Sequence, residues 1–99
     1  MAELNWSAEA LAWLEDIHGY IAADNPFAAA KVMDGIIQRA EQLRRFPDMG
    51  SRLRAVEEGD VRVLLYGHYR IAYLYRADDV VVDILGVFHG ALDIGRYLP

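Results

Sequence analysis

The spacing of apolar and polar residues changes once along the chain, from a helical period in the first half to a two-residue alternation in the second. A short alternating stretch at residues 3–6 predicts a first strand. Ser7 then follows as a helix cap, because its side-chain oxygen can accept a hydrogen bond from a first-turn N–H. At about 100° per residue, one stripe of this helix faces the core: Ala10, Leu14, Ile17 and Ile21. Trp13 and Tyr20 fall together on the shoulder of the stripe.

A second helix is predicted to begin at Asn25, its cap, with Pro26 at the first helical position, where a missing N–H costs nothing. This helix ends before Pro47. Its buried positions are expected to be Ala29, Val32, Met33, Ile36, Ala40 and Leu43. Because about two residues join the helices, we expect them to pack antiparallel as a hairpin.

The second half of the chain reads as four strands, at residues 52–56, 61–66, 69–76 and 80–88, with turns between them. In the strand at 69–76, Tyr69 and Tyr73 share one face and Arg70 lies on the other. The element order predicts one α+β domain over residues 1–99. In it, the N-terminal strand and the helical hairpin pack on one face of a twisted, mostly antiparallel sheet.

Composition narrows the class of protein. The 99 residues are 55% hydrophobic and 25% charged, which is typical of a single folded domain. The absence of cysteine excludes a disulfide scaffold, a thiolate nucleophile and cysteine-ligated metal. No apolar run approaches the ~18 residues that span a bilayer, and residues 1–5 do not resemble a secretory signal. We therefore expect a cytoplasmic protein with no membrane partner.

The charge argues against autonomous nucleic-acid binding. The net charge is -5 and the pI is about 5.0, whereas nucleic-acid binders usually carry a basic surplus that neutralises phosphates. We expect no direct sequence-specific DNA binding by this chain alone.

The sequence offers few groups for catalysis. Its histidines, at 18, 68 and 89, lack metal-ligand spacing, and no glycine-rich phosphate loop is present, so neither a metal nor a cofactor is expected. What remains is a set of polar groups, Arg62, Arg70, His89 and Tyr97. We expect Arg62 and Arg70 to be neighbours on the uncovered face of the sheet.

Two interpretations of that set stay open. Guanidinium groups beside an imidazole and a phenol can hold a phosphate and shuttle a proton. The alternative, which spacing alone favours, is that Arg70 pairs with a carboxylate such as Asp83 and that His89 is an ordinary turn residue.

An ordered series of short motifs runs along nearly the whole chain: Trp6-Ser7, Tyr20-Ile21, Asn25-Pro26, Phe46-Pro47-Asp48-Met49-Gly50, Val61-Arg62, Tyr69-Arg70-Ile71-Ala72-Tyr73 and Val87-Phe88-His89-Gly90-Ala91-Leu92-Asp93. In this order they resemble the RelE/ParE superfamily, the toxins of bacterial type II toxin–antitoxin modules. The resemblance implies the same helical hairpin on an antiparallel sheet.

Two branches of that superfamily imply different activities. RelE-like members cut mRNA on the ribosome with a basic cluster and a late tyrosine, without metal. The matching set here is Arg62, Arg70, His89 and Tyr97. It is incomplete, because Leu64 replaces a basic residue and His89 stands near the place of an arginine.

ParE-like members instead poison DNA gyrase. The Phe-Pro-Asp-Met-Gly loop and the His-Gly-Ala-x-Asp ending resemble this branch, although Leu92 stands where the family often has arginine. The acidic pI also favours this branch, since a ribosome-directed nuclease must approach a dense phosphate surface.

The resemblance therefore implies a ParE-like toxin, associated with growth inhibition and plasmid stabilisation, that inhibits DNA gyrase by binding. We expect no catalytic residues and no cofactor, and a ParD-like antitoxin that neutralises the toxin in a hetero-oligomer. The alternatives are a RelE-like ribosome-dependent mRNA endonuclease and an inactive relative that only binds antitoxin.

A disordered antitoxin tail that folds on binding needs a docking surface on the toxin. We expect Trp13 and Tyr20 to provide an apolar groove, and Arg62 and Arg70 to receive antitoxin carboxylates. The alternative is that both aromatic side chains only seal the rim of the helix–sheet core.

Overall fold

The computed structural model describes residues 1–90 and 94–99, and its elements confirm the predicted α+β order. The elements are β1 (Glu3–Trp6), α1 (Ala8–Ala22), α2 (Pro26–Glu41), β2 (Ser51–Val56), β3 (Gly59–Tyr66), β4 (Tyr69–Arg76) and β5 (Val81–His89), with 3-10 turns at Gln42–Arg44 and Ile94–Arg96. Four strand boundaries differ from the prediction by one or two residues. β2 begins one residue early, at Ser51, and β5 ends one residue late, at His89. β3 begins at Gly59, inside the expected turn. β5 begins one residue late, because Val80 has a φ of 55°, outside the range of strand backbone.

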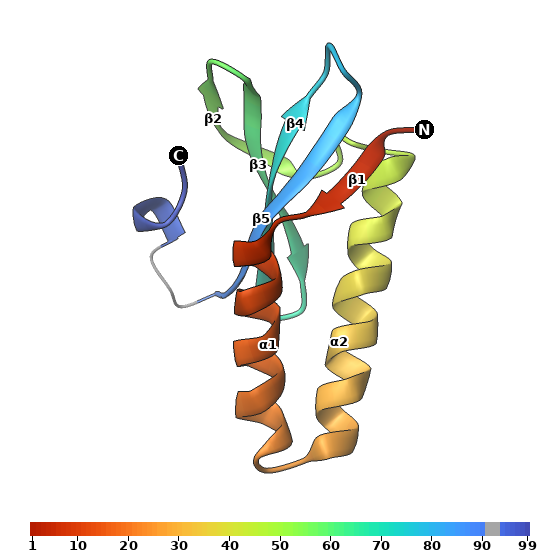
Figure 1. Ribbon diagram of the computed structural model, residues 1–99, viewed down its shortest axis with the longest axis vertical. Helices are drawn as coiled ribbons and strands as arrows, with labels where there is room; N and C mark the ends of the chain where they lie inside the picture. Colours follow the sequence, from red (N-terminus) through yellow and green to blue (C-terminus); the bar gives the residue numbers. More distant parts are fainter. Residues whose placement is uncertain (91–93) are drawn as a thin grey trace.

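The helical hairpin forms where the capping residues predicted it. The Ser7 hydroxyl accepts a hydrogen bond from the Ala10 N–H at 3.0 Å. Asn25 caps α2 by accepting from the Ala28 N–H at 3.1 Å, with Pro26 in the first turn. The two helices then run side by side along one face of the sheet (Figure 1). In the part of the chain that is described, no helix is long and apolar enough to cross a membrane.

The sheet is mostly antiparallel, as predicted. Its strand order is β1-β5-β4-β3-β2, in which β1 pairs with β5 in parallel and every other pair is antiparallel. The main core lies between this sheet and the hairpin. Its fully buried members include Ala10, Ile36, Ala40, Leu43, Ile71, Tyr73, Val82, Ile84 and Val87. The buried positions that the helical periodicity predicted at 10, 36 and 40 are thus confirmed.

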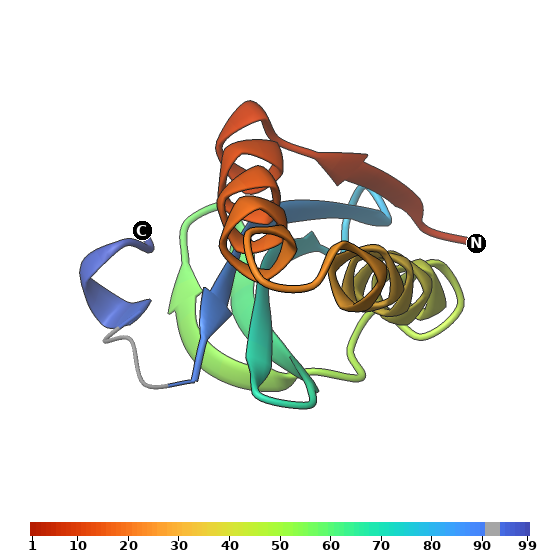
Figure 2. The same ribbon diagram turned by 90° about the horizontal axis from the view of Figure 1, so that it is seen from below.

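The opposite face of the sheet is partly covered, which corrects the expectation of an open face. Ala72 and Phe88 project from that face and are buried with Ile94 of the C-terminal segment. Val63 and Leu98 pack against this second cluster. The C-terminal segment accordingly lies on the side of the sheet away from α2 (Figure 2).

Candidate functional site

Arg62 and Arg70 project from opposite faces of the sheet, so the prediction that they share the uncovered face is wrong. In the β3–β4 register Arg62 lies opposite Tyr73, and Arg70 lies opposite Leu65. Directly opposed residues in an antiparallel pair project on the same side. Arg62 is therefore on the side of the core residue Tyr73, whereas Arg70 is on the other side, about 10 Å further along the strands.

Arg62 is held inside the fold by the loop that precedes β2. Its Nη1 donates to the backbone oxygens of Asp48 at 3.1 Å and Gly50 at 2.7 Å, and Nη2 lies 3.7 Å from a carboxylate oxygen of Asp60. Its side chain is only 18% exposed. We call this set, with Tyr73, the loop clamp. Arg62 thus acts as a structural tie between the loop and the sheet.

Tyr73 completes the loop clamp from β4. Its hydroxyl accepts a hydrogen bond from the Gly50 N–H at 2.9 Å. Burial of the phenol raises the pKa of Tyr73 above its usual value of 10.0, and the Gly50 hydrogen bond and the Arg62 charge oppose that rise. The neutral phenol is therefore the form that the folded loop clamp favours.

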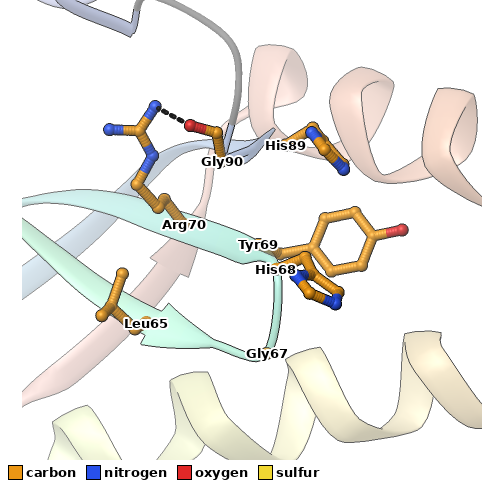
Figure 3. A pocket seen from close by; sticks show the side chains of 7 residues that line it. All are labelled: Leu65, Gly67, His68, Tyr69, Arg70, His89 and Gly90. Carbon is orange, nitrogen blue, oxygen red and sulfur yellow. Dashed lines mark hydrogen bonds between the residues drawn. The ribbon is translucent and has the colours of Figure 1, made fainter.

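Arg70 lines a pocket at the other end of the same strand pair. This turn pocket has a volume of about 310 Å³ and is formed by Leu65, Gly67, His68, Tyr69, Arg70, His89 and Gly90. Figure 3 shows Arg70 bending toward Gly90, whose backbone oxygen accepts from Nη2 at 3.1 Å. The Gly90 N–H in turn donates to the His68 oxygen at 2.7 Å. Asp83, which the alternative interpretation named as an example of a carboxylate partner for Arg70, pairs instead with Arg76 at 3.0 Å.

A second hollow runs along α1. This shoulder groove has a volume of about 450 Å³ and is lined by Trp13, Asp16, Ile17, Tyr20, Tyr69, Val87 and His89. The structure therefore brings Trp13 and Tyr20 into one groove, as their spacing suggested. The two hollows share Tyr69 and His89, whose rings meet edge to face with centroids 5.9 Å apart.

Trp13 and Tyr20 differ in how much of each remains accessible. The Trp13 ring packs edge-on against Phe88, with centroids 4.6 Å apart, and against Tyr97 at 5.4 Å. Tyr20 is 85% exposed. The alternative interpretation, that these aromatics seal the rim of the core, therefore describes Trp13 but not Tyr20.

The nuclease candidates do not converge on one site. Arg70 and His89 line the turn pocket, whereas Arg62 belongs to the loop clamp. Tyr97 stacks on Phe88 with centroids 5.9 Å apart and lines neither hollow. Of the motif residues, Ala91, Leu92 and Asp93 lie outside the described residues.

His68 was overlooked in the sequence and belongs to the turn pocket. Its position in the turn between two strands, two residues before Arg70, was the available signal. A guanidinium and two imidazoles at one pocket suit an anion such as a carboxylate or a phosphate. Among residues 1–90 and 94–99, no group of His, Asp and Glu side chains is arranged to hold a metal ion.

Both the sequence and the fold are similar to those of known proteins. Residues 4–94 match the family model described as the ParE toxin of the type II toxin–antitoxin system parDE. The fold is similar to a chain of the chromosomal ParDE toxin–antitoxin system from P. aeruginosa, with 24% identity, a TM-score of 0.70, and coverage of 90% of this chain and 96% of that one. It is also similar to a chain of the RelBE2 toxin–antitoxin complex from Mycobacterium tuberculosis, with 22% identity, a TM-score of 0.66, and coverage of 89% and 96%.

The search of curated proteins finds no match. The two solved structures confirm the fold inferred from the motif series, and the family match covers nearly the whole chain. The chain belongs to the ParE toxin family of type II toxin–antitoxin systems.

Proposed function

We propose that this toxin acts in the cytoplasm by binding DNA gyrase, without catalysis of its own, and that a ParD-like antitoxin neutralises it. The observation that carries the proposal is the match of residues 4–94 to the ParE model, since gyrase poisoning is the activity that ParE-like sequences imply. The acidic net charge of -5 supports a protein target over a bare nucleic acid.

The positions of the catalytic candidates favour binding over cleavage. Metal-free RNA cleavage needs a proton acceptor and cationic groups within hydrogen-bond reach of one phosphate. Arg62 is instead engaged by backbone oxygens on the other face of the sheet from Arg70. Tyr97 contacts the rings of Trp13 and Phe88 and lines neither hollow.

Antitoxin binding is supported by the shoulder groove. An exposed aromatic such as Tyr20, next to a concave apolar surface, is typical of a protein-binding site. We therefore assign Trp13, Tyr20 and Arg70 to antitoxin binding. Arg62 is left out because its donors tie the loop clamp together, so any effect on binding would pass through that loop.

A second candidate function, a RelE-like mRNA endonuclease, has one observation in its favour. Arg70, His68 and His89 line the same pocket, and a guanidinium beside imidazoles can bind a phosphate and move a proton. The two functions predict different damaged molecules, so one experiment separates them.

The test places purified toxin, freed from its antitoxin, with gyrase, supercoiled plasmid and ATP, and in parallel with translating ribosomes and mRNA. We expect trapped plasmid cleavage and lost supercoiling with intact mRNA. Codon-phased mRNA cuts with unaffected gyrase would overturn the proposal in favour of the nuclease. Inactivity in both tubes, with a complex still formed with antitoxin, would instead identify an inactive relative.

The Arg70→Ala variant adds a second test of the nuclease alternative. A nuclease should lose its cleavage, because a cation at the phosphate is removed. The matched control is Arg45→Ala, which removes an exposed arginine that lines neither hollow.

A further inference from the structure

The two helices of the hairpin form a third hollow, on the flank of α1 away from the shoulder groove. Its volume is about 270 Å³. We call it the hairpin groove, and residues of both helices line it: Leu14, Glu15, His18, Met33 and Ile37. At about 100° per residue, the stripe of α1 with Trp13, Ile17 and Tyr20 lies roughly 150° from the stripe in this groove, and the core stripe lies between them. α1 therefore has a separate hollow on each side of its core contact.

The hairpin groove has an apolar floor and apolar rims. Leu14 is buried and Met33 is half-buried, and both pack in the main core. On α2, Ile37 is 41% exposed, and on α1, Leu11, one turn before Leu14 and Glu15, is 47% exposed. These two aliphatic side chains leave apolar surface in water on both sides of the groove, and burial of that surface by a partner is favourable.

The acidic charge of the protein lies in the half of the chain that forms this groove. Residues 1–38 contain six acidic side chains and one basic side chain, so they account for the whole net charge of -5, whereas residues 39–99 contain nine of each. Glu15 lines the groove, and the exposed Asp34 lies one turn before Ile37. Neither carboxylate forms an ion pair with a residue that the structure describes. Their charge is therefore not neutralised by those residues.

This combination of apolar surface and acidic charge restricts the kind of molecule that fits the groove. A second copy of the chain is disfavoured, because it would bring two acidic hairpins together and like charges repel. A nucleic acid is disfavoured for the same reason, since its phosphates are anionic. The complementary occupant is a basic protein surface that also offers an apolar side chain.

We propose that the hairpin groove is the surface through which this toxin binds its target, and that the contact on gyrase is a Lys- and Arg-lined surface from which an apolar side chain enters the groove between Leu11 and Ile37. The proposal rests on the gyrase binding proposed above and specifies the toxin residues and the chemistry of the target surface. An enzyme that holds duplex DNA carries basic surfaces that neutralise phosphates, so its charge complements that of the hairpin. Opposite flanks of α1 then serve the antitoxin and the target.

The experiment measures the dissociation constant of purified toxin, freed from its antitoxin, for immobilised gyrase, together with trapped plasmid cleavage. Leu11→Ala and Ile37→Ala are each expected to weaken gyrase binding by about 5- to 50-fold, because each removes an apolar rim of the groove. Glu15→Lys is expected to weaken binding by about 10-fold at low salt and by less at high salt, because ions screen the charges. The toxin concentration needed for plasmid cleavage should rise by the same factors.

Matched controls separate the groove from the surface in general. Leu53→Ala removes a leucine of β2 that is 42% exposed and therefore as accessible as the groove rims. Glu57→Lys changes the net charge by the same amount as Glu15→Lys, but in the turn between β2 and β3. Each control should change the dissociation constant by less than about 3-fold. Circular dichroism and thermal melting verify that every variant is folded.

The same variants are then tested against the antitoxin encoded beside this toxin and for self-association. Because the groove lies on the other flank of α1 from Tyr20, Leu11→Ala and Ile37→Ala should bind the antitoxin within about 3-fold of the wild type. If both variants lose antitoxin binding as strongly as gyrase binding, the groove belongs to the antitoxin and the proposal is overturned. A wild-type dimer in sedimentation velocity that Ile37→Ala dissociates would identify a second copy as the occupant and would also overturn it.

The outcomes also separate this inference from the proposed function. If the wild-type toxin neither binds gyrase nor traps plasmid cleavage, the proposed function fails and this inference fails with it. If the wild type binds gyrase and Leu11→Ala, Ile37→Ala and Glu15→Lys leave both binding and cleavage unchanged, only the present inference fails. If the two apolar variants weaken binding but Glu15→Lys does not, the basic character assigned to the target surface is wrong.

Discussion

The two ends of the β3–β4 pair use the same residue type for different purposes. At one end Arg62 is 18% exposed and donates to two backbone oxygens in the loop clamp. At the other end Arg70 lines a pocket that opens to solvent and donates to the Gly90 oxygen at its rim. The difference arises from what covers each end, a folded loop at one and a short turn at the other.

This contrast shows that one arginine of the strand pair can stabilise the fold while another lines a candidate binding pocket. Hydrogen bonds from a charged donor to backbone acceptors inside the fold are among the stronger ones, whereas a charged hydrogen bond at the surface contributes less to folding because solvent screens it. Substitutions at the two ends should therefore separate stability from binding.

The largest expected effect is that of Arg62→Ala, which should lower the free energy of unfolding by about 2 to 3 kcal/mol, because the backbone oxygens of Asp48 and Gly50 lose a charged donor. A midpoint about 10 to 20 °C lower in a thermal melt would follow for a domain of this size. The matched control is Arg52→Ala, since Arg52 pairs with the same Asp60 at 3.3 Å but is 56% exposed. Equal decreases in the free energy of unfolding of Arg62→Ala and Arg52→Ala would contradict the stabilising role assigned to Arg62 in the loop clamp.

Tyr73→Phe should have the next largest effect, about 1 to 2 kcal/mol, because the buried Gly50 N–H loses its acceptor while the ring remains in the core. Urea denaturation measures this loss. Tyr75→Phe, on the same strand but more exposed, provides the comparison. An unchanged free energy of unfolding in Tyr73→Phe would mean that the hydroxyl does not stabilise the closed loop.

The loop clamp should also weaken at high pH. Burial raises the pKa of Tyr73 above 10.0 in the folded state, so the unfolded chain releases the phenolic proton first. The resulting stability is fully present below about pH 10 and is lost as the pH rises through the folded-state pKa. The free energy of unfolding, measured by denaturation at a series of pH values from about 8 upward, should therefore fall more steeply for the wild type than for Tyr73→Phe. The same pH dependence in both proteins would contradict the raised pKa of Tyr73.

The smallest expected effect on folding is that of Arg70→Ala. The hydrogen bond from Arg70 to the Gly90 oxygen lies at the exposed rim of the pocket, so its loss should lower the free energy of unfolding by less than about 1 kcal/mol. Chemical denaturation beside Arg62→Ala tests the contrast directly. A loss as large as that of Arg62→Ala would show that the turn end is also a structural tie.

Most of the fold was predictable because its signals are local. Ser7, Asn25 and Pro26 mark helix starts through bonds that span only three residues. Alternation predicted the strands to within one or two residues. The cover of the second face by Ile94 and Leu98 was not predictable, since it depends on where a tail folds back over distant strands.

The candidate site was only partly predictable, and one error was avoidable. The turn at Gly67–His68 pairs Tyr66 with Tyr69, so counting back along both strands places Arg62 opposite Tyr73 and therefore on the core face. The link from Arg62 to the loop at Asp48–Gly50 was not available, because it depends on how that loop returns to the sheet.

The parallel pairing of β1 with β5 has a consequence for the order of events during translation. The Asn5 side chain donates a hydrogen bond to Asp83 across 78 positions of the chain, and among the described residues the sheet partner of β1 is Val81–Ile84. β1 therefore has no partner strand in the sheet until β5 has been synthesised. Loop closure over such a separation slows folding, and nascent chains expose unpaired strands until it occurs. Because β5 also supplies Val87 and His89 to the shoulder groove, the proposed docking surface cannot form before the ribosome has synthesised β5.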